Sequence, residues 1–258
     1  MGASLLGHPC DRYLWLNFRW VKPTKFPGRM LRLFRRGHNE EATIISDLRA
    51  IGVDVRGAQS RVDFGSHVSG SADAIAASGV PESPKKVHLL EFKTHNLKNF
   101  KNLQKNGVEK AQPKHWTQMH VYMLGLGIDR ALYVAVCKDD DQMYTERVRL
   151  DSDLAHKFVE RGQRIALDDR MPPPISTDPS WYQCKMCDFH SVCHQGELPK
   201  QFGCRTCAHA TAKEDSTWRC EKHEADGIPV EFQRKGCEQG IIHPDIVPWK
   251  YTVEKDYV

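Results

Sequence analysis

The stretch Gly70–Lys93 constrains the fold more than any other part of the chain. It reads GSADAIAASGVPESPKKVHLLEFK and holds two short apolar runs, of which the first carries Asp73 and the second carries Glu91. The connection between them is rich in Gly, Ser and Pro, which predicts two strands joined by a turn. Side chains alternate between the faces of a strand, so Glu91 and Lys93 share one face. The stretch therefore predicts two carboxylates and a lysine on neighbouring strands of one sheet.

The periodicity of the surrounding chain predicts an α/β sandwich in which helices flank a mixed central sheet. We expect helices over residues 29–51, 115–126 and 152–169, and strands over residues 53–64, 67–77, 87–95, 131–137 and 143–150. Apolar and aromatic residues within positions 1–20 predict a short buried helix. Residues 94–114 are rich in Asn and Lys, and we expect them to form a long loop.

Charge and hydropathy narrow the class of protein. No apolar run reaches the roughly 18 residues of a membrane span, and the start does not read as a secretory signal, so we expect a cytoplasmic protein without a membrane contact. Residues 12–39 contain no acidic side chain, and residues 93–114 contain six lysines but one acid, Glu109. Such basic runs suit a polyanion such as DNA, although a solvated surface explains each run alone equally well.

The carboxylates and the lysine point to one kind of chemistry. Asp73 and Glu91 offer the oxygen ligands that Mg²⁺ prefers, and Lys93 can orient a water or offset the charge of a phosphate. Metal-assisted phosphodiester hydrolysis needs this combination, although each element also occurs on ordinary surface strands. His38 and Glu41 share a face of the first long helix and are further candidate ligands; a core histidine is the alternative for His38.

At these residues the chain resembles the PD-(D/E)XK nuclease superfamily, in its RecB-like branch. The resemblance rests on Ser71–Ile75, Leu90–Lys93 and a Gln-x-x-x-Tyr motif in the following helix, and covers roughly residues 29–150. It implies a restriction-endonuclease-like core whose catalytic residues are Asp73, Glu91, Lys93, Gln118 and Tyr122, and whose Mg²⁺ or Mn²⁺ ligands are His38, Glu41, Asp73 and Glu91. A plain core position is the alternative for Tyr122.

Seven of the nine cysteines lie within residues 184–237, and in a reducing compartment such clusters are more often metal ligands than disulfides. The first set combines a C-x-x-C-x5-C segment with a distant fourth residue: Cys10, Cys184, Cys187 and Cys193. It resembles the iron–sulfur staple of AddB-type and CRISPR-adaptation nucleases, which implies a [4Fe–4S] cluster clamping both ends of the nuclease domain. A zinc site with the same ligands is the alternative.

The second set predicts a structural zinc site in a small C-terminal module. Five residues compete for its four positions: Cys204, Cys207, Cys220, His223 and Cys237. A segment of this length buries little core, so a bound metal would supply much of its folding free energy. The remaining cysteine, Cys137, is expected to be a small buried residue at a strand end.

These patterns divide the chain into four segments: residues 1–28, which supply one cluster cysteine; 29–172, the nuclease core; 173–198, the iron–sulfur loop; and 199–258, the zinc module and tail. The expected function is a metal-dependent DNA exonuclease of recombination or repair, of bacterial or phage type. Its expected partners are DNA and a recombination or single-strand annealing protein. An endonuclease or CRISPR-adaptation-type nuclease is one alternative, and a non-catalytic, metal-stapled DNA-binding protein is the other.

Overall fold

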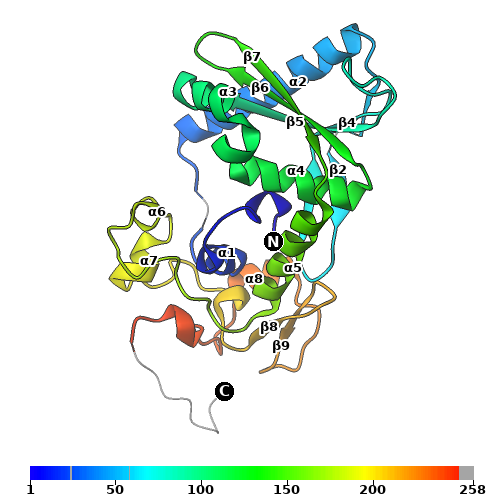
Figure 1. Cartoon of the computed structure of the whole chain (residues 1–258). Coiled ribbons are helices and arrows are strands. Elements are labelled where there is room, and N and C mark those ends of the chain that lie inside the picture. The colour runs from blue at the N-terminus through cyan, green and yellow to red at the C-terminus, as the bar shows by residue number, and fades with distance from the viewer. Residues whose placement is uncertain (24, 58, 250–258) are drawn as a thin grey trace.

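A five-stranded sheet with the order β1-β4-β5-β6-β7 forms the centre of the computed structural model, which describes residues 1–23, 25–57 and 59–249 (Figure 1). Its strands are β1 (Val55–Arg56), β4 (Ala74–Ala76), β5 (His88–His95), β6 (Arg130–Cys137) and β7 (Met143–Arg149). Strands β5 and β6 run parallel, and the other neighbours are antiparallel. The predicted α/β fold with a mixed central sheet is therefore confirmed. Cys137 ends β6 and is buried, as expected.

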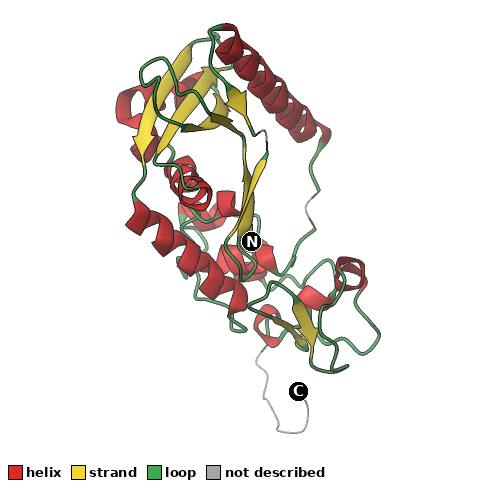
Figure 2. Cartoon of the chain, turned by 90° about the vertical axis from the view of Figure 1, so that its right-hand side faces the viewer, coloured by secondary structure: helices red, strands yellow, loops and turns green. Residues whose placement is uncertain are grey.

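Helices cover both faces of this sheet. The helix α2 (Gly28–Ala50) lies on one face, and α3 (Leu97–Ala111) and α4 (Pro113–Leu126) lie on the other; α5 (Ser152–Leu167) packs on α4, and α1 (Asp11–Phe18) packs on α5. On one face, Leu89 of β5 packs in a cluster with residues of α3 and α4; on the other, Leu90 and Phe92 pack with Ile44 of α2. This alternation along β5 follows from the two-residue period of a strand. The sheet therefore lies between two apolar layers, and among the described helices α2 covers the face that carries Leu90 and Phe92 (Figure 2).

The expected loop at residues 94–114 is a helix, α3, so that prediction was wrong. The Asn96 side chain accepts a hydrogen bond from the Asn99 amide and caps the helix start. Phe100 and Leu103 lie three residues apart, and both are fully buried against the sheet. The few apolar residues of this segment stand between lysines and asparagines, so its composition is typical of a loop. The helix is stabilised by the packing of those few residues.

The two long strands expected over residues 53–64 and 67–77 are each divided. β1 and β4 belong to the central sheet, whereas β2 (Ser60–Asp63) and β3 (Ser69–Ala72) pair with each other in a separate two-stranded sheet. Gly57, with a φ of 64°, turns the chain between β1 and β2, and Asp73 forms the bend between β3 and β4. Asp73 therefore lies between two strands and not inside one. The expected turn at Gly65 and Ser66 joins β2 to β3.

The C-terminal part of the chain packs against α1 and α5 (Figure 1). Its elements are α6 (Tyr182–Lys185), α7 (His190–Gln195), β8 (Ala210–Ala212), β9 (Trp218–Cys220) and α8 (Val230–Lys235), with short 3₁₀ helices at Cys204–Thr206 and Pro244–Ile246. The Arg205 guanidinium lies 3.7 Å from the Trp20 ring centroid and donates a 3.0 Å hydrogen bond to the Phe18 carbonyl. Residues 250–258 of the expected C-terminal tail lie outside the described residues. Within the part that is described, no helix is long and apolar enough to cross a membrane.

Candidate active site

The backbone brings Asp73 and Glu91 together at the centre of the sheet. Ala74 of β4 pairs with Leu90 of β5, so the bend at Asp73 lies beside Glu91. Asp73 Oδ2 accepts a 3.1 Å hydrogen bond from the Phe92 amide, which fixes the carboxylate against β5. The predicted pair of carboxylates on neighbouring segments is thus present in space, although its first member comes from a bend.

Glu91 is completely buried and only half satisfied. Its Oε1 accepts hydrogen bonds from Lys93 Nζ and, at 2.8 Å, from Gln118 Nε2. Its Oε2 is buried and has no hydrogen-bond partner among the described residues. Burial raises the pKa of Glu91 to about 7, although the Lys93 charge opposes this shift. A buried carboxylate oxygen without a donor is costly, and a cation is the ligand that matches it.

Lys93 is a cation at this site. Burial lowers its pKa, but the carboxylates of Glu91 and Asp73 outweigh burial, and the net pKa is raised. Its side chain is 24% exposed, so the ammonium group remains accessible from the adjoining cavity. In this state Lys93 can neutralise phosphate charge and cannot accept a proton.

A cavity of about 510 Å³ opens beside these residues, between α2 and the end of β5. Asp73 and Lys93 line it from the sheet, and His38 and Glu41 line it from α2. Burial and the nearby Asp73 charge raise the pKa of Glu41, whereas His38 is an exposed side chain. The structure therefore brings both helix residues to the cavity that holds Asp73, with Glu41 the more enclosed of the two.

The two α4 candidates have different environments. Gln118 is 8% exposed and directs its amide at Glu91, so it orients that carboxylate. Tyr122 is 3% exposed and packs in the apolar cluster; a Cβ atom added at Gly70 would lie 2.7 Å from its ring. Burial raises the pKa of Tyr122. Neither side chain lines the cavity, so Gln118 acts on Glu91 and Tyr122 supports the strand that leads to Asp73.

Sequence reasoning missed a hydrogen-bonded trio next to Lys93. The Tyr133 hydroxyl lies 2.9 Å from both His95 Nε2 and His115 Nδ1, and Tyr133 is the register partner of Glu91. Burial lowers the pKa of His115 to about 3, and the Lys93 charge adds to the effect, so the ring is neutral. His95 stands two residues after Lys93 and shares its face of the strand, and this spacing was the available signal.

A comparison of sequences decides the family. The sequence pattern of the PD-(D/E)XK nuclease superfamily matches residues 12–194, well over half of the chain. The chain belongs to the PD-(D/E)XK nuclease superfamily. It is a phosphodiester hydrolase of the nuclease type. Nucleases of this superfamily use divalent metals such as Mg²⁺ and Mn²⁺, and none of the curated protein sequences matches the chain.

Several solved structures resemble this nuclease distantly. SSO0001 is 15% identical with a TM-score of 0.47, covering 75% of this chain and 84% of its own. The alkaline exonuclease LHK-Exo of Laribacter hongkongensis, in complex with dAMP, is 18% identical with a TM-score of 0.48 over 64% of this chain and 85% of its own. A phage-related exonuclease from Haemophilus somnus 129PT is 15% identical with a TM-score of 0.40, over 60% and 78%. These likenesses are too distant to transfer a substrate or mechanism.

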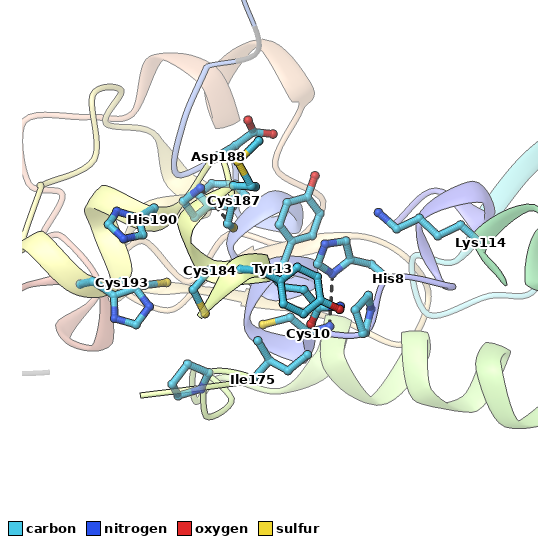
Figure 3. Close-up of a pocket in the computed structure, with 17 residues that line it drawn as sticks. His8, Cys10, Tyr13, Lys114, Ile175, Cys184, Cys187, Asp188, His190 and Cys193 are labelled. Atoms are coloured by element: carbon cyan, nitrogen blue, oxygen red, sulfur yellow. Dashed lines mark hydrogen bonds between the residues drawn. The ribbon is translucent and has the colours of Figure 1, made fainter. Parts of the chain in front are cut away.

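The nuclease gathers the first cysteine set around one cavity of about 350 Å³, which Cys10, Cys184, Cys187 and Cys193 all line (Figure 3). His8 and Tyr13 stack beside them with ring centroids 3.8 Å apart. Burial raises the pKa of Cys193 to about 11 and also raises that of Cys187. Cys10, just before the family match begins at residue 12, and three cysteines near its end at residue 194 thus line one cavity.

The second set lines a smaller cavity formed by residues 202–240. Cys204, Cys207, Cys220, His223 and Cys237 all contribute to its wall, and Cys237 Sγ lies 3.8 Å from His223 Nε2. His209, which the sequence analysis did not select, lines it too. Across residues 1–23, 25–57 and 59–249, no three His, Cys, Asp or Glu side chains are arranged as a ready-made metal site. The residues of each set therefore line one cavity, but their side chains do not point at a common centre.

Proposed function

We propose that this nuclease is a metal-dependent deoxyribonuclease, an exonuclease that acts on DNA ends in recombination or repair. In this proposal it works in the cytoplasm of a bacterial cell or a phage-infected host. The observation that carries the proposal is Glu91 Oε2, a buried and unpartnered oxygen beside the accessible Lys93 ammonium group. A divalent cation would satisfy this oxygen, and the ammonium group would then face the substrate phosphate.

The residues fit a divalent ion. Asp73 and Glu91 would hold it from the sheet, and Glu41 would add a third carboxylate from α2, with His38 as the alternative. Burial raises the pKa values of Glu41 and Glu91, and the nearby Asp73 charge adds to both shifts; a cation relieves this repulsion. When bound, the ion supplies a Lewis acid and an activated water. Gln118 holds Glu91 in place, and Lys93 offsets the phosphate charge.

The distribution of basic side chains supports a DNA substrate. Exposed Lys98, Lys101 and Lys105 lie on α3, the helix that directly follows the strand of Glu91 and Lys93. They replace the lysine-rich loop that the sequence analysis expected, and they present the same charge from a rigid element. Backbone phosphates bound in this way make the affinity sensitive to salt. A recombination or single-strand annealing protein is the proposed protein partner.

The test is cleavage of end-labelled linear DNA in the presence of Mn²⁺. Asp73→Ala and Lys93→Ala should abolish cleavage, whereas Asp153→Ala and Lys157→Ala, which change exposed residues of the same types on α5, should cleave as wild type. Wild-type protein that binds DNA but never cleaves it would identify the non-catalytic DNA-binding alternative. Cleavage of covalently closed circular DNA would identify an endonuclease or CRISPR-adaptation-type nuclease, because an exonuclease needs an end.

We further propose that Cys10, Cys184, Cys187 and Cys193 hold a [4Fe–4S] cluster. The shared cavity supports this, since it joins residues from both ends of the nuclease domain. Protein purified without oxygen should be brown, with iron and sulfide released on acid treatment, and Cys184→Ser should lose both. Cys137→Ser, which changes a buried cysteine elsewhere, should retain them. A colourless wild-type protein that contains zinc in this site would contradict the proposal.

For the second set we propose a structural zinc ion bound by Cys204, Cys207 and Cys220, with His223 or Cys237 as the fourth ligand. All five residues line one cavity, which supports the set. His223 and Cys237 lie side by side in its wall, so both positions suit the fourth ligand. Zinc content after His223→Ala and after Cys237→Ser should differ, because only the true ligand is required. Wild-type protein without zinc would contradict this proposal.

A further inference from the structure

Two exposed aromatic rings stand beside the active-site cavity, at the start of α2. Phe26 and Phe34 are 48% and 39% exposed, and their rings meet edge to face with centroids 4.8 Å apart and an interplanar angle of 89°. Ile44 is the first buried residue of α2, so the preceding turns of the helix extend past the apolar core. Apolar rings held in water at such a place indicate a binding surface.

The same segment is strongly basic. Arg29, Arg32 and Arg35 are exposed, and none of them forms an ion pair with any described residue. Arg36 donates a 2.9 Å hydrogen bond to the Lys138 carbonyl, which ties α2 to the turn between β6 and β7. Because residues 12–39 include no acid, no opposite charge of the segment itself compensates these guanidinium groups. Uncompensated guanidinium groups beside exposed rings therefore suit a partner of negative charge better than a purely apolar protein surface.

Phe34 links this surface to the catalytic residues. Its side chain lines the same cavity of about 510 Å³ as Asp73 and Lys93. A molecule that rests on the Phe34 ring therefore lies at the wall of the cavity that Lys93 also lines. Aromatic rings that alternate with cationic side chains along a groove are the usual means of binding single-stranded nucleic acid: the rings stack on bases, and the cations follow the phosphates.

We infer that Phe26 and Phe34 form a stacking platform for unpaired bases of the DNA strand that enters the cavity. The bases of a duplex are stacked on one another and present no free face, so the platform acts on single strands and on frayed or overhanging ends. Arg29 and Arg32 neutralise the phosphates of that strand. The substrate class is thus single-stranded DNA or a duplex with an unpaired terminus; this inference rests on the proposed DNA nuclease function.

Binding in EDTA tests the platform without turnover. The full-length protein is titrated into a labelled oligothymidylate and, separately, into a labelled blunt linear duplex of equal length, which has no loop, and fluorescence anisotropy reports the Kd. Phe34→Ala should weaken oligothymidylate binding about tenfold, because one base loses its stacking partner. Phe34→Trp should restore it. The matched control is Phe232→Ala, which removes a 54% exposed ring from α8 and should change neither affinity.

A second readout follows the base itself. Wild-type protein should quench 2-aminopurine placed near the end of a single strand, and Phe34→Ala should remove the quenching. Unchanged oligothymidylate affinity in Phe34→Ala overturns the platform, as does an equal loss on the blunt linear duplex or a failure of Phe34→Trp to restore binding. A wild-type protein that binds neither DNA and cleaves none overturns the proposed nuclease function as well, whereas normal cleavage with no effect of Phe34→Ala overturns the platform alone.

Discussion

The nuclease core and the C-terminal cysteine-rich segment enclose their polar groups in different ways. In the core, two apolar layers surround Glu91, and residues such as Phe100 and Leu89 are fully buried. In the segment after Pro174, the buried side chains are fewer and share their clusters with α1 and α5. The core therefore holds an unfavourable carboxylate by packing together with hydrogen bonds from Lys93 and Gln118, whereas the C-terminal segment depends on its neighbours and, as proposed, on metals.

The difference matters for function because the candidate active site lies in the core, whereas the proposed stabilising metals lie in the C-terminal segment. Glu91 costs folding free energy, since its buried oxygen has no partner among the described residues, and in our proposal it serves catalysis. The cysteines of the C-terminal segment lie away from the 510 Å³ cavity and line cavities of their own. Changes to the charged groups of the core should therefore reduce cleavage, whereas changes to the cysteines of the C-terminal segment should reduce stability.

Removal of a zinc ligand is expected to have the largest effect. Cys204→Ser should leave residues 199–249 without their proposed zinc ion, and because little apolar core replaces it, this part should unfold while the central sheet persists. Limited proteolysis followed by mass spectrometry measures this as new cleavage confined to the C-terminal segment. Cys137→Ala is the control, and an unchanged digestion pattern for Cys204→Ser would show that the module is stable without metal.

Glu91→Gln should lose cleavage yet gain relative stability as the pH rises. The folded-state pKa of Glu91 is about 7 against an ordinary value of 4.5, so the folded state binds more protons than the unfolded state between these values. Its contribution to the free energy of unfolding therefore falls as the pH increases through this window, by up to roughly 3 kcal/mol. Urea unfolding in EDTA at pH 5 and pH 8 measures the difference between variant and wild type. A difference that does not change with pH would contradict the burial argument.

Arg205→Ala should loosen the contact between the two regions. It removes the guanidinium from the rings of Trp20, Phe18 and Trp218 and deletes the hydrogen bond to the Phe18 carbonyl. We expect a loss of about 2–3 kcal/mol in the free energy of unfolding. Arg205→Lys keeps the charge but not the planar stacking, so it should recover only part of the loss. Equal stability of the alanine variant and wild type would show that the apolar contacts alone hold this interface.

Acid should weaken the same interface through His67. Its ring lies near the Phe18 and Trp218 rings, and burial, helped by the charges of the amino terminus and Arg205, lowers its pKa to about 4. The unfolded state thus binds more protons between pH 4 and 6.5, and stability is lost as the pH falls through that window, by about 1–2 kcal/mol. His67→Phe should flatten this pH dependence in thermal unfolding. A wild-type profile in the variant would assign the acid sensitivity to another group.

Much of the core was readable from short, strong patterns. The run from Leu89 to Phe92 has three large apolar residues among four, which favours a buried strand paired on both sides, and Pro113 and Gly127 mark the ends of α4. By contrast, α3 was missed because its lysines and asparagines outnumber the apolar residues that bury it. The prediction merged β1 with β2 and β3 with β4, because a turn at one glycine (Gly57) and a bend at one aspartate (Asp73) leave little compositional trace.

The active site divides in the same way. The sequence by itself determined that Asp73, Glu91 and Lys93, the residues that we propose for metal-dependent cleavage, lie on neighbouring segments, because alternation along one strand and a short connection restrict where they can lie. Only the tertiary structure decided that Glu91 keeps an unpartnered oxygen, that Gln118 orients it and that Phe34 forms a wall of the same cavity. Burial and hydrogen bonding depend on segments far apart in the chain, and local spacing contains no information about them.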